Sequence, residues 1–511
     1  MAGDVGMSFE TFVDASLALL DLEILIWLLA GVLLGIVVGG LPGLGPPLGM
    51  AIILPLTLPL DAAPAIILLV GVYSGSMYGG SIAAILINTP GVSSSAATMF
   101  DGYPMSKQGR AGTALSISAT ASAFAGLFTI TALILFSPLL AQMVLAVGTP
   151  ERFLVALLGL CMITVITRGS FAKGLLAGFA GLLVTTIGSA QPVATDRRYS
   201  DHLLLFDGID FVAVLIGLFA IAEMMKLAGQ KGGIAEGEVT IDASGIREGI
   251  KSTFSRPVTV FKSGMIGMIV GAIPGAGATV SNFVAYSEAV RSSSEPETFG
   301  SGNEVGVVAS ESSNNGTVAG SLVPAISFGI PGSSSTAVLI GGLLMHGVTP
   351  GTQMFQADGE LLLTYTMLLA LLIGNVVILV VGLGAVTRLG YLTKIDTNYI
   401  IPMVVVLSFL GTYALRINPI DILTIIIFGV IGFYMVRYNY SVIAFVLGVV
   451  LGDIAEDNLR TALQLSDGSY MIFINPFEYG RWLSPILSLV IFWLLVGPFA
   501  KPWIDRKLGR N

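Results

Sequence analysis

Apolar stretches long enough to cross a lipid bilayer follow one another along nearly the whole chain. A transmembrane helix needs about 20 mainly apolar residues, and helices satisfy their own backbone polar groups inside the lipid. Only 11% of the 511 residues are charged, against about 25% in soluble proteins. The sequence therefore predicts an all-α polytopic membrane protein with about 11–13 transmembrane helices. The candidate spans are Leu22–Val38, Ala62–Tyr78, Ala114–Phe136, Phe153–Thr167, Phe171–Gly188, Phe211–Leu227, Met265–Ala278, Leu361–Val386, Tyr399–Leu415, Ile420–Val436, Ser441–Gly452 and Leu483–Phe499.

Composition also excludes several classes of function. The 24 Lys and Arg residues are outnumbered by 32 Asp and Glu residues, and no basic stripe is present that could neutralise nucleic-acid phosphates. The single cysteine, Cys161, lies in an apolar run, which favours a small buried hydrophobe. With two histidines, zinc sites are not expected. A Walker A motif is absent from the sequence, which argues against a built-in ATPase.

The positions of Lys and Arg predict the orientation in the membrane, because cytoplasmic loops are enriched in these residues. No Lys or Arg precedes Lys107, so we expect the amino terminus to lie outside the cytoplasm. The first residues also lack the basic region of a cleaved signal peptide, so the first span should be retained. The predicted parts are a first repeat (1–228), a cytoplasmic linker (229–260), a second repeat (261–416) and C-terminal helices (417–511) with a periplasmic segment (453–481) and a cytoplasmic tail.

Two different Pro-Gly motifs recur in the same order in the two halves. GIVVGGLPGLG at Gly35–Gly45 matches GMIVGAIPGAG at Gly267–Gly277, and the motif at Gly80–Ala96 matches that at Gly320–Ala337 with one inserted residue. The second copy begins near Lys262, on the predicted cytoplasmic side, whereas the first begins on the predicted outer side. The sequence therefore predicts inverted repeats, which many secondary transporters use to build a site at the bilayer midplane.

The second motif of each pair predicts a re-entrant helical hairpin. A helix from Gly80 to Pro90 would cover roughly 15 Å, about half of the hydrocarbon core. Proline then ends the helix, and a serine triplet suits the N-cap of the next one, whose free N–H groups attract carboxylates. The alternative is that the serines only cap helices that pack without a ligand. The predicted substrate-binding residues are Asn88, Thr89, Pro90, Gly91, Ser93, Ser94, Ser95, Pro331, Gly332, Ser333, Ser334 and Ser335.

A coupling cation is predicted near the same hairpins. The helices before the breaks end with free carbonyl groups near Asn88 and Gly329, which suit Na⁺. Glu311 is an acid in an apolar segment, and it could bind a cation or a proton together with Asn314 and Asn315. The alternative is an acid that caps a helix or lines a cavity. No other metal and no organic cofactor are predicted.

Two further helix breaks come from the first motif of each pair. They could form walls of the same site, or they could simply allow close backbone packing. The residues of these breaks are Pro42, Gly43, Gly45, Pro274, Gly275 and Gly277.

The quoted motifs resemble those of a known family. YGGSIAAILINTPG, DGYPMSKQGRAGTAL and ESSNNGTVAGSLVPAISFGIPGSSSTAVLIGGLLMHG are similar to the large membrane subunit of the tripartite tricarboxylate transporters, from Gly31 to Phe355. The resemblance implies a multi-pass carrier of the bacterial inner membrane that works with a small membrane subunit and a periplasmic substrate-binding protein. It also implies coupling to Na⁺ or protons. The positions that it carries over are Asn88, Pro90, Gly91, Ser93, Pro331, Gly332, Ser333, Glu311, Asn314 and Asn315.

This chain departs from the family pattern at Thr349–Thr352 and at Ser312-Ser313, beside the expected site, so its substrate could differ from a tricarboxylate. Together these features predict secondary active import of di- or tricarboxylates or related organic anions, by elevator-type alternating access. The alternatives are a passive anion channel and an intramembrane serine hydrolase, for which His346 would be the candidate base. The sequence leaves a homo-oligomer open.

Overall fold

Helices make up nearly all of the regular structure. The computed structural model describes residues 9–41, 43–166, 171–190, 195–196, 202–229, 245–356, 359–385, 388 and 397–494. In this part of the chain six helices are long and apolar enough to cross a membrane, and further apolar helices are shorter. The predicted all-α polytopic membrane protein is thereby confirmed. The strands β1 (Ser189–Ala190) and β2 (Thr195–Asp196) form one short antiparallel pair.

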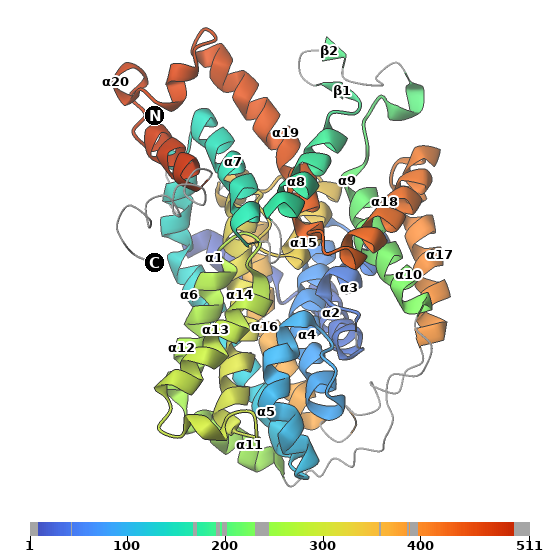
Figure 1. Ribbon diagram of the computed structural model, residues 1–511, viewed down its shortest axis with the longest axis vertical. Coiled ribbons are helices and arrows are strands. Elements are labelled where there is room, and N and C mark those ends of the chain that lie inside the picture. Colours follow the sequence, from blue (N-terminus) through green and yellow to red (C-terminus); the bar gives the residue numbers. More distant parts are fainter. Residues whose placement is uncertain are drawn as a thin grey trace.

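Figure 1 shows the helices in the order in which they follow one another along the chain. In chain order they are α1 (Phe9–Ala18), α2 (Leu22–Gly40), α3 (Pro46–Ile53), η1 (Leu54–Thr57), α4 (Ala62–Ile87), η2 (Ser93–Ser95), α5 (Ala96–Lys107), α6 (Ala111–Ala146), α7 (Thr149–Ile166), α8 (Phe171–Thr185), η3 (Leu203–Leu205), α9 (Phe211–Leu215), η4 (Ile216–Ile221), α10 (Ala222–Ala228), α11 (Gly245–Phe254), α12 (Pro257–Gly271), α13 (Gly277–Ser292), η5 (Pro296–Thr298), α14 (Glu304–Phe328), α15 (Ser334–Met345), η6 (Thr352–Phe355), α16 (Leu361–Gly384), α17 (Thr397–Arg416), α18 (Pro419–Arg437), α19 (Val442–Leu465), η8 (Tyr470–Phe473) and α20 (Pro476–Tyr479).

Three predicted boundaries differ from the observed ones. Gly80 lies inside α4, so the segment before the first break is the end of one 26-residue helix and not a separate half-helix. The predicted span Met265–Ala278 is divided, because α12 ends at Gly271 and a turn follows. Helix α19 continues to Leu465, well into the segment expected outside the membrane. Residues 230–244 of the predicted linker, the tail from 495 onward and Pro42 lie outside the described residues.

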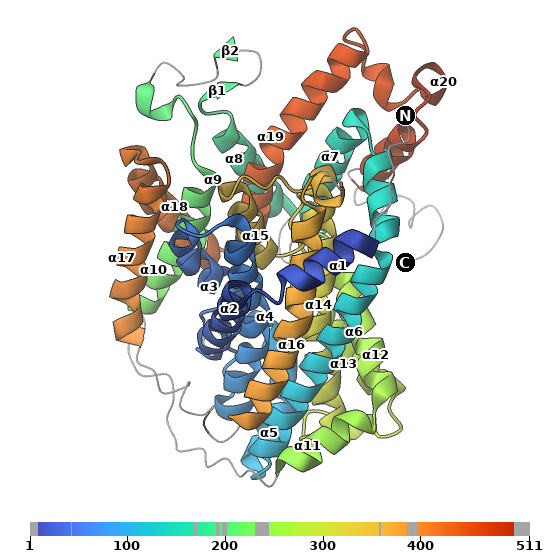
Figure 2. The ribbon, with the colours of Figure 1, turned by 180° about the vertical axis from the view of Figure 1, so that it is seen from behind.

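Two helix pairs packed through glycine form the centre of the bundle. Helix α2 runs parallel to α4, and a β-carbon built on Gly35 would lie only 2.5 Å from the carbonyl oxygen of Val72. Helix α12 runs parallel to α14 in the same way, and a β-carbon on Gly267 would lie 2.3 Å from the carbonyl oxygen of Ser313. Glycine lets two helix backbones approach this closely, as at many membrane helix contacts. Figure 2 shows α2 and α4 beside each other.

The helices α4 and α14 cross in opposite directions. The Tyr73 hydroxyl lies 2.8 Å from Ser321 Oγ, and Ser81 Oγ donates to Glu311 Oε1 at 2.6 Å. Between them, Asn314 Nδ2 donates to the carbonyl oxygen of Met77 at 2.8 Å. Residue numbers thus rise along α4 while they fall along α14. The α2–α4 pair and the α12–α14 pair therefore run antiparallel to each other where they pack together. The broken segments lie at this crossing.

The carboxylate of Asp101 ties the first half of the chain to the second. It is fully buried on α5, and its Oδ1 accepts hydrogen bonds from the backbone N–H groups of Gly300, Gly302 and Asn303, at 2.8–3.0 Å. Its Oδ2 accepts from the Tyr286 hydroxyl at 2.8 Å. These bonds hold the loop before α14 against α5. Asp101 therefore fixes the start of the helix that carries Glu311.

Asp101→Ala is expected to destabilise the fold strongly. A hydrogen bond to a charged group contributes about 1.5–3 kcal/mol, and the substitution removes the carboxylate that accepts from three N–H groups and one hydroxyl group, all of them part-buried. Asp101→Asn keeps an oxygen acceptor and should lose much less. Thermal unfolding of the detergent-solubilised chain would measure the difference, and equal melting temperatures for the two variants would contradict this role.

Candidate functional site

The first break reverses the chain at the end of α4. Asn88 adopts a left-handed conformation with φ 53°, and the following residues return along α4 until the Gly91 N–H donates to the carbonyl oxygen of Gly80 at 3.0 Å. The return covers about 10 Å, since Gly80 lies seven residues before Ile87. Helix η2 and then α5 start from this inner level. The serine triplet Ser93–Ser95 therefore lies about two turns back along α4 and not at the end of that helix.

The second break has the same design. Helix α14 ends before Gly329, which has φ 67°, and the chain returns until Gly332 lies beside Ser321, eleven residues earlier. Helix α15 then starts with Ser333 as its N-cap. Thr336 N–H donates to Ser333 Oγ at 3.2 Å, and Ser333 N–H donates to Thr336 Oγ1 at 2.9 Å. This reciprocal pair is a capping box.

The two serine triplets differ in how their side chains are satisfied. In the first triplet, Ser95 Oγ lies 3.2 Å from Ser81 Oγ, while Ser94 is buried and its hydroxyl has no partner among the described residues. Ser93 is exposed. In the second triplet, Ser333 is used as a cap, as the alternative interpretation expected, whereas Ser334 is half-buried. Ser94 and Ser334 are therefore the serines best placed to meet a ligand.

The start of α13 connects the two breaks. The Gly275 N–H donates to the carbonyl oxygen of Gly332 at 3.1 Å, and Asn282 Nδ2 donates to the carbonyl oxygen of Ser94 at 3.1 Å. Gly275 and Asn282 are seven residues apart, and Gly277 at the start of the helix has φ 61°. Sequence reasoning did not identify Asn282. Asn282 could have been found by the feature that identified Glu311, a polar side chain within an apolar segment.

The helix break of the first repeat also lies beside a serine triplet. A β-carbon built on Gly91 would lie 2.1 Å from the carbonyl oxygen of Gly39, at the end of α2. A β-carbon on Gly45 would lie 3.8 Å from Val92 Cγ1. Gly43 has φ 86°, a conformation that favours glycine. The α2 break therefore packs against the first broken segment, as the α12 break does against the second.

Glu311 is the most polar group at the crossing. It is 0% exposed, and four hydroxyl groups from α4, α5 and α6 donate hydrogen bonds to its carboxylate. The described part of the chain provides no Lys, Arg or His partner for it. A lone acid buried in a membrane bundle is a strong functional candidate. The donors are Ser81 at 2.6 Å, Thr98, Ser118 at 2.9 Å and Ser122 at 3.0 Å.

Two amides follow Glu311 on the same helix. Asn314 Nδ2 donates to the carbonyl oxygen of Met77, and Asn315 Nδ2 donates to Asn375 Oδ1 at 3.1 Å. Both amide oxygens are buried without a partner in the described part of the chain, as are the hydroxyl groups of Ser312 and Ser313. The segment therefore presents several buried oxygens that lack donors, next to a carboxylate.

The two groups of residues predicted to bind a cation, one near Asn88 and Gly329 and the other at Glu311, Asn314 and Asn315, lie in different places. Asn88 is exposed and lies eleven residues, or about 16 Å of helix, beyond Met77. Gly329 lies eighteen residues, or about 27 Å of helix, beyond Glu311. The reason is that α4 and α14 each continue for two turns past the level of the serines. Only the Glu311, Asn314 and Asn315 group lies at the crossing.

His346 does not meet any serine of the two triplets. Its Nε2 atom lies 3.0 Å from Thr57 Oγ1, and the Thr57 hydroxyl in turn donates to the carbonyl oxygen of Leu54 at 2.7 Å. A serine hydrolase needs its base within hydrogen-bond reach of the nucleophile. The geometry gives the hydrolase alternative no support.

Membrane-length helices, two broken segments at an antiparallel crossing and a buried polar centre define a multi-pass membrane transport protein. The chain belongs to the tripartite tricarboxylate transporter TctA family, whose model matches residues 25–447. This range includes both breaks and Glu311. The family is one of transporters and not of enzymes, and its members work within tripartite systems.

The chain is also similar to two curated proteins from Agrobacterium vitis. "Uncharacterized 52.8 kDa protein in TAR-I ttuC' 3'region" is 34% identical over 432 residues, which cover 84% of this chain and 85% of the relative. "Uncharacterized protein in TAR-II ttuC' 3'region" is 29% identical over 211 residues, which cover 41% of this chain and 86% of the relative. No solved structure matches the chain.

Proposed function

We propose that this chain is the large membrane subunit of a secondary active importer of di- or tricarboxylates in a bacterial inner membrane. A periplasmic binding protein would deliver the substrate, a small membrane subunit would complete the complex, and a Na⁺ or proton gradient would drive uptake. One observation carries the proposal. The helices that follow the two serine triplets begin at the crossing of α4 and α14, and Gly275 and Asn282, at the start of α13, contact both of these beginnings.

The arrangement of the two halves supports alternating access. The sequence repeat pairs Gly35–Gly45 and Gly80–Ala96 with Gly267–Gly277 and Gly320–Ala337, and the helices of the two copies run in opposite directions at the crossing. Inverted repeats with broken helices can open one central site to each side of the membrane in turn. Because each copy carries its own broken segment, we favour an elevator movement of these segments together with their helices.

The spacing of the two helix starts fits a short dicarboxylate. Tyr73 lies at the level of the second break and Ser81 at that of the first, so the breaks are about 12 Å apart along α4. A hydrogen bond of about 3 Å at each end leaves roughly 6 Å for the ligand. Two carboxylates separated by a few carbon atoms span such a gap. The N–H groups at a helix start and the serine hydroxyls are suitable donors for them.

Glu311 supports coupling to a cation. A buried carboxylate without a basic partner is costly unless it carries a proton or binds a cation. Asn314 and Asn315 add amide oxygens that have no hydrogen-bond donor among the described residues, and Na⁺ or a proton could join this group. The proposed coupling site is therefore beside the substrate site and separate from Asn88 and Gly329.

Uptake by proteoliposomes tests the proposal. The vesicles should contain this chain and its small membrane subunit, and the cognate binding protein loaded with labelled acid should be added outside. We expect accumulation only when a Na⁺ or proton gradient is present. Equal uptake after both gradients are collapsed would refute coupling, and steady single-channel current would indicate the passive channel instead.

Ser94→Ala and Ser334→Ala are expected to raise the KM of uptake about tenfold or more each, because a hydrogen bond to a charged ligand contributes about 1.5–3 kcal/mol. Ser116→Ala is the matched control, since this buried serine donates only to the carbonyl oxygen of Gly112 in its own helix. Initial uptake rates over a range of acid concentrations give the KM values. An unchanged KM in both variants would remove the serine triplets from the substrate site.

A further inference from the structure

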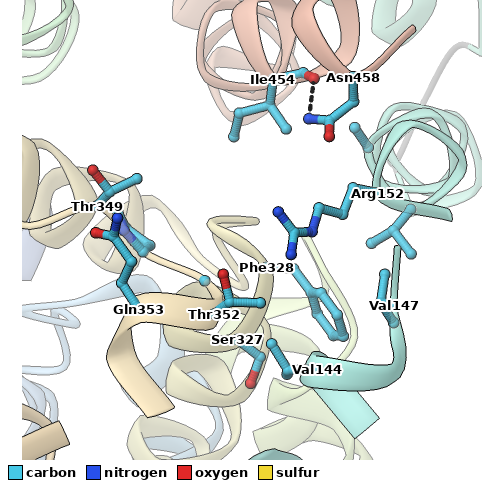
Figure 3. Close-up of a pocket in the computed structure, with 14 residues that line it drawn as sticks. Val144, Val147, Arg152, Ser327, Phe328, Thr349, Thr352, Gln353, Ile454 and Asn458 are labelled. Carbon is cyan, nitrogen blue, oxygen red and sulfur yellow. Dashed lines mark hydrogen bonds between the residues drawn. The ribbon is translucent and has the colours of Figure 1, made fainter. Parts of the chain in front are cut away.

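A cavity of about 240 Å³ lies beyond the last turn of α14, outside the polar centre (Figure 3). It is smaller than the typical pocket of a drug-sized ligand, about 300–1,000 Å³, and its size therefore suits a small organic acid. The polar residues around it come from α7, the end of α14, the loop after α15 and α19. They are Arg152, Ser327, Thr349, Thr352, Gln353 and Asn458.

Arg152 gives this cavity its charge. Figure 3 shows the guanidinium group extending into the space between α19 and Phe328. Within the described residues it has no hydrogen-bond or ion-pair partner, because the neighbouring acid Glu151 is buried and paired with Arg481 at 2.8 Å and Ser484 at 2.6 Å. Among the described residues that line the cavity, none is acidic. A guanidinium with free donors is the side chain best suited to hold a carboxylate through two hydrogen bonds.

The loop Thr349–Gln353 faces Arg152 and adds polar groups. The Gly351 N–H donates to the carbonyl oxygen of Ile326 at 2.9 Å, and Gly351 has φ 122°, so the loop is held against the last turn of α14. Figure 3 shows the Thr352 hydroxyl directed toward the cavity. The loop therefore forms a polar wall of the cavity opposite the Arg152 guanidinium.

The cavity adjoins the second broken segment. A β-carbon built on Gly329 would lie 3.6 Å from Pro350 Cβ and 3.5 Å from Ile454 Cδ1, both from cavity-lining residues. The chain runs from Gly329 directly to the N-cap Ser333. An acid held at Arg152 would therefore be one short segment away from the proposed substrate site.

We propose that this cavity is an outer docking site, in which Arg152 binds a carboxylate group of the acid before the acid reaches the substrate site at Ser94 and Ser334. The inference rests on the proposed function, because it takes the ligand to be the transported carboxylate. The inference adds a second binding site for the substrate, and it identifies Arg152 as the positive charge that attracts the substrate to that site.

Protection of an introduced cysteine from labelling tests this site. Thr352→Cys is made in a Cys161→Ser background, so that the new thiol is the only one, and its rate of reaction with N-ethylmaleimide is measured in proteoliposomes. The probes are citrate, tricarballylate, malate and succinate at millimolar concentration. At least one acid should slow the labelling about tenfold or more, and adding Arg152→Gln should abolish this protection.

Two further variants make the result specific. Arg437→Gln removes a positive charge at another cavity and should leave the protection intact. Ser334→Ala should also leave it intact, because the docking site is separate from the inner one. If Thr352→Cys does not react, Gln353→Cys serves as the reporter on the same loop.

The outcomes separate this inference from the proposed function. The docking site is refuted if none of the four acids protects the reporter thiol, or if protection persists after Arg152→Gln. Arg152-dependent protection without gradient-driven uptake would support the docking site and refute the proposed function. Uptake that depends on Ser94 and Ser334 but gives no protection would do the opposite.

Discussion

Gly91→Ala is expected to reduce carboxylate uptake about 100-fold while the protein still inserts into the membrane. A β-carbon at this position would lie 2.1 Å from the carbonyl oxygen of Gly39 and 2.7 Å from Gly80 Cα. Both are backbone atoms of long helices that cannot move aside, so the broken segment itself must shift. A displacement of about 1 Å at a binding centre can cost about 10²-fold in function. The serine triplet that follows Gly91 would lose its position toward the ligand.

Two other glycine variants calibrate this effect. Gly332 occupies the same place in the second break, but its β-carbon would lie 2.9 Å from the nearest backbone atoms, so Gly332→Ala should lower uptake less than Gly91→Ala does. Gly384→Ala is the control, because no atom of the described residues lies within 4 Å of the added carbon. Uptake by proteoliposomes with equal amounts of each protein gives the comparison. Normal uptake by Gly91→Ala would show that the position of the first broken segment does not matter for transport.

The helix breaks were predictable because their chemistry is local. A Pro-Gly pair disfavours continuation of a helix, although single prolines such as Pro138 and Pro324 lie inside α6 and α14, and glycine or asparagine is favoured where the backbone turns left-handed. The chain accordingly leaves α4 at Asn88 and α14 at Gly329. The capping role of Ser333 is local in the same sense, since its partner Thr336 is three residues away. Features of this kind can be read from a short window of sequence.

The contacts of Glu311 could not be read in this way. Its four hydroxyl donors come from α4, α5 and α6, and they are 189–230 residues away in the sequence. Only the antiparallel crossing of α4 and α14 brings them together. Asn88 and Gly329, which were also predicted to bind a cation, lie away from Glu311 for a related reason. Sequence spacing gave no sign that each broken segment returns two turns along its helix before the serines begin.

Glu311→Gln is expected to abolish gradient-driven accumulation of the substrate, at least about tenfold below the wild type, while exchange of substrate between the two sides persists. Glutamine has nearly the shape of glutamate, and its oxygen still accepts from hydroxyl groups such as those of Ser81 and Thr98. Its amide can donate to the oxygens of Ser118 and Ser122, because hydroxyl groups also accept. The centre should therefore stay folded. Glutamine cannot release a proton or neutralise a cation, so coupling is lost although the substrate site remains.

The choice of variant and control makes this result interpretable. Glu311→Leu would leave four buried hydroxyl groups without an acceptor, at about 1–3 kcal/mol each, and would report on folding instead of coupling. Asp101→Asn is the matched control, since it also neutralises a fully buried acid but one that is held by backbone N–H groups. Accumulation and counterflow are measured in the same proteoliposomes. If Glu311→Gln keeps the Na⁺ and pH dependence of the wild type, the coupling ion binds elsewhere, and the unpaired oxygens of Asn314 and Asn315 lose their proposed role with it.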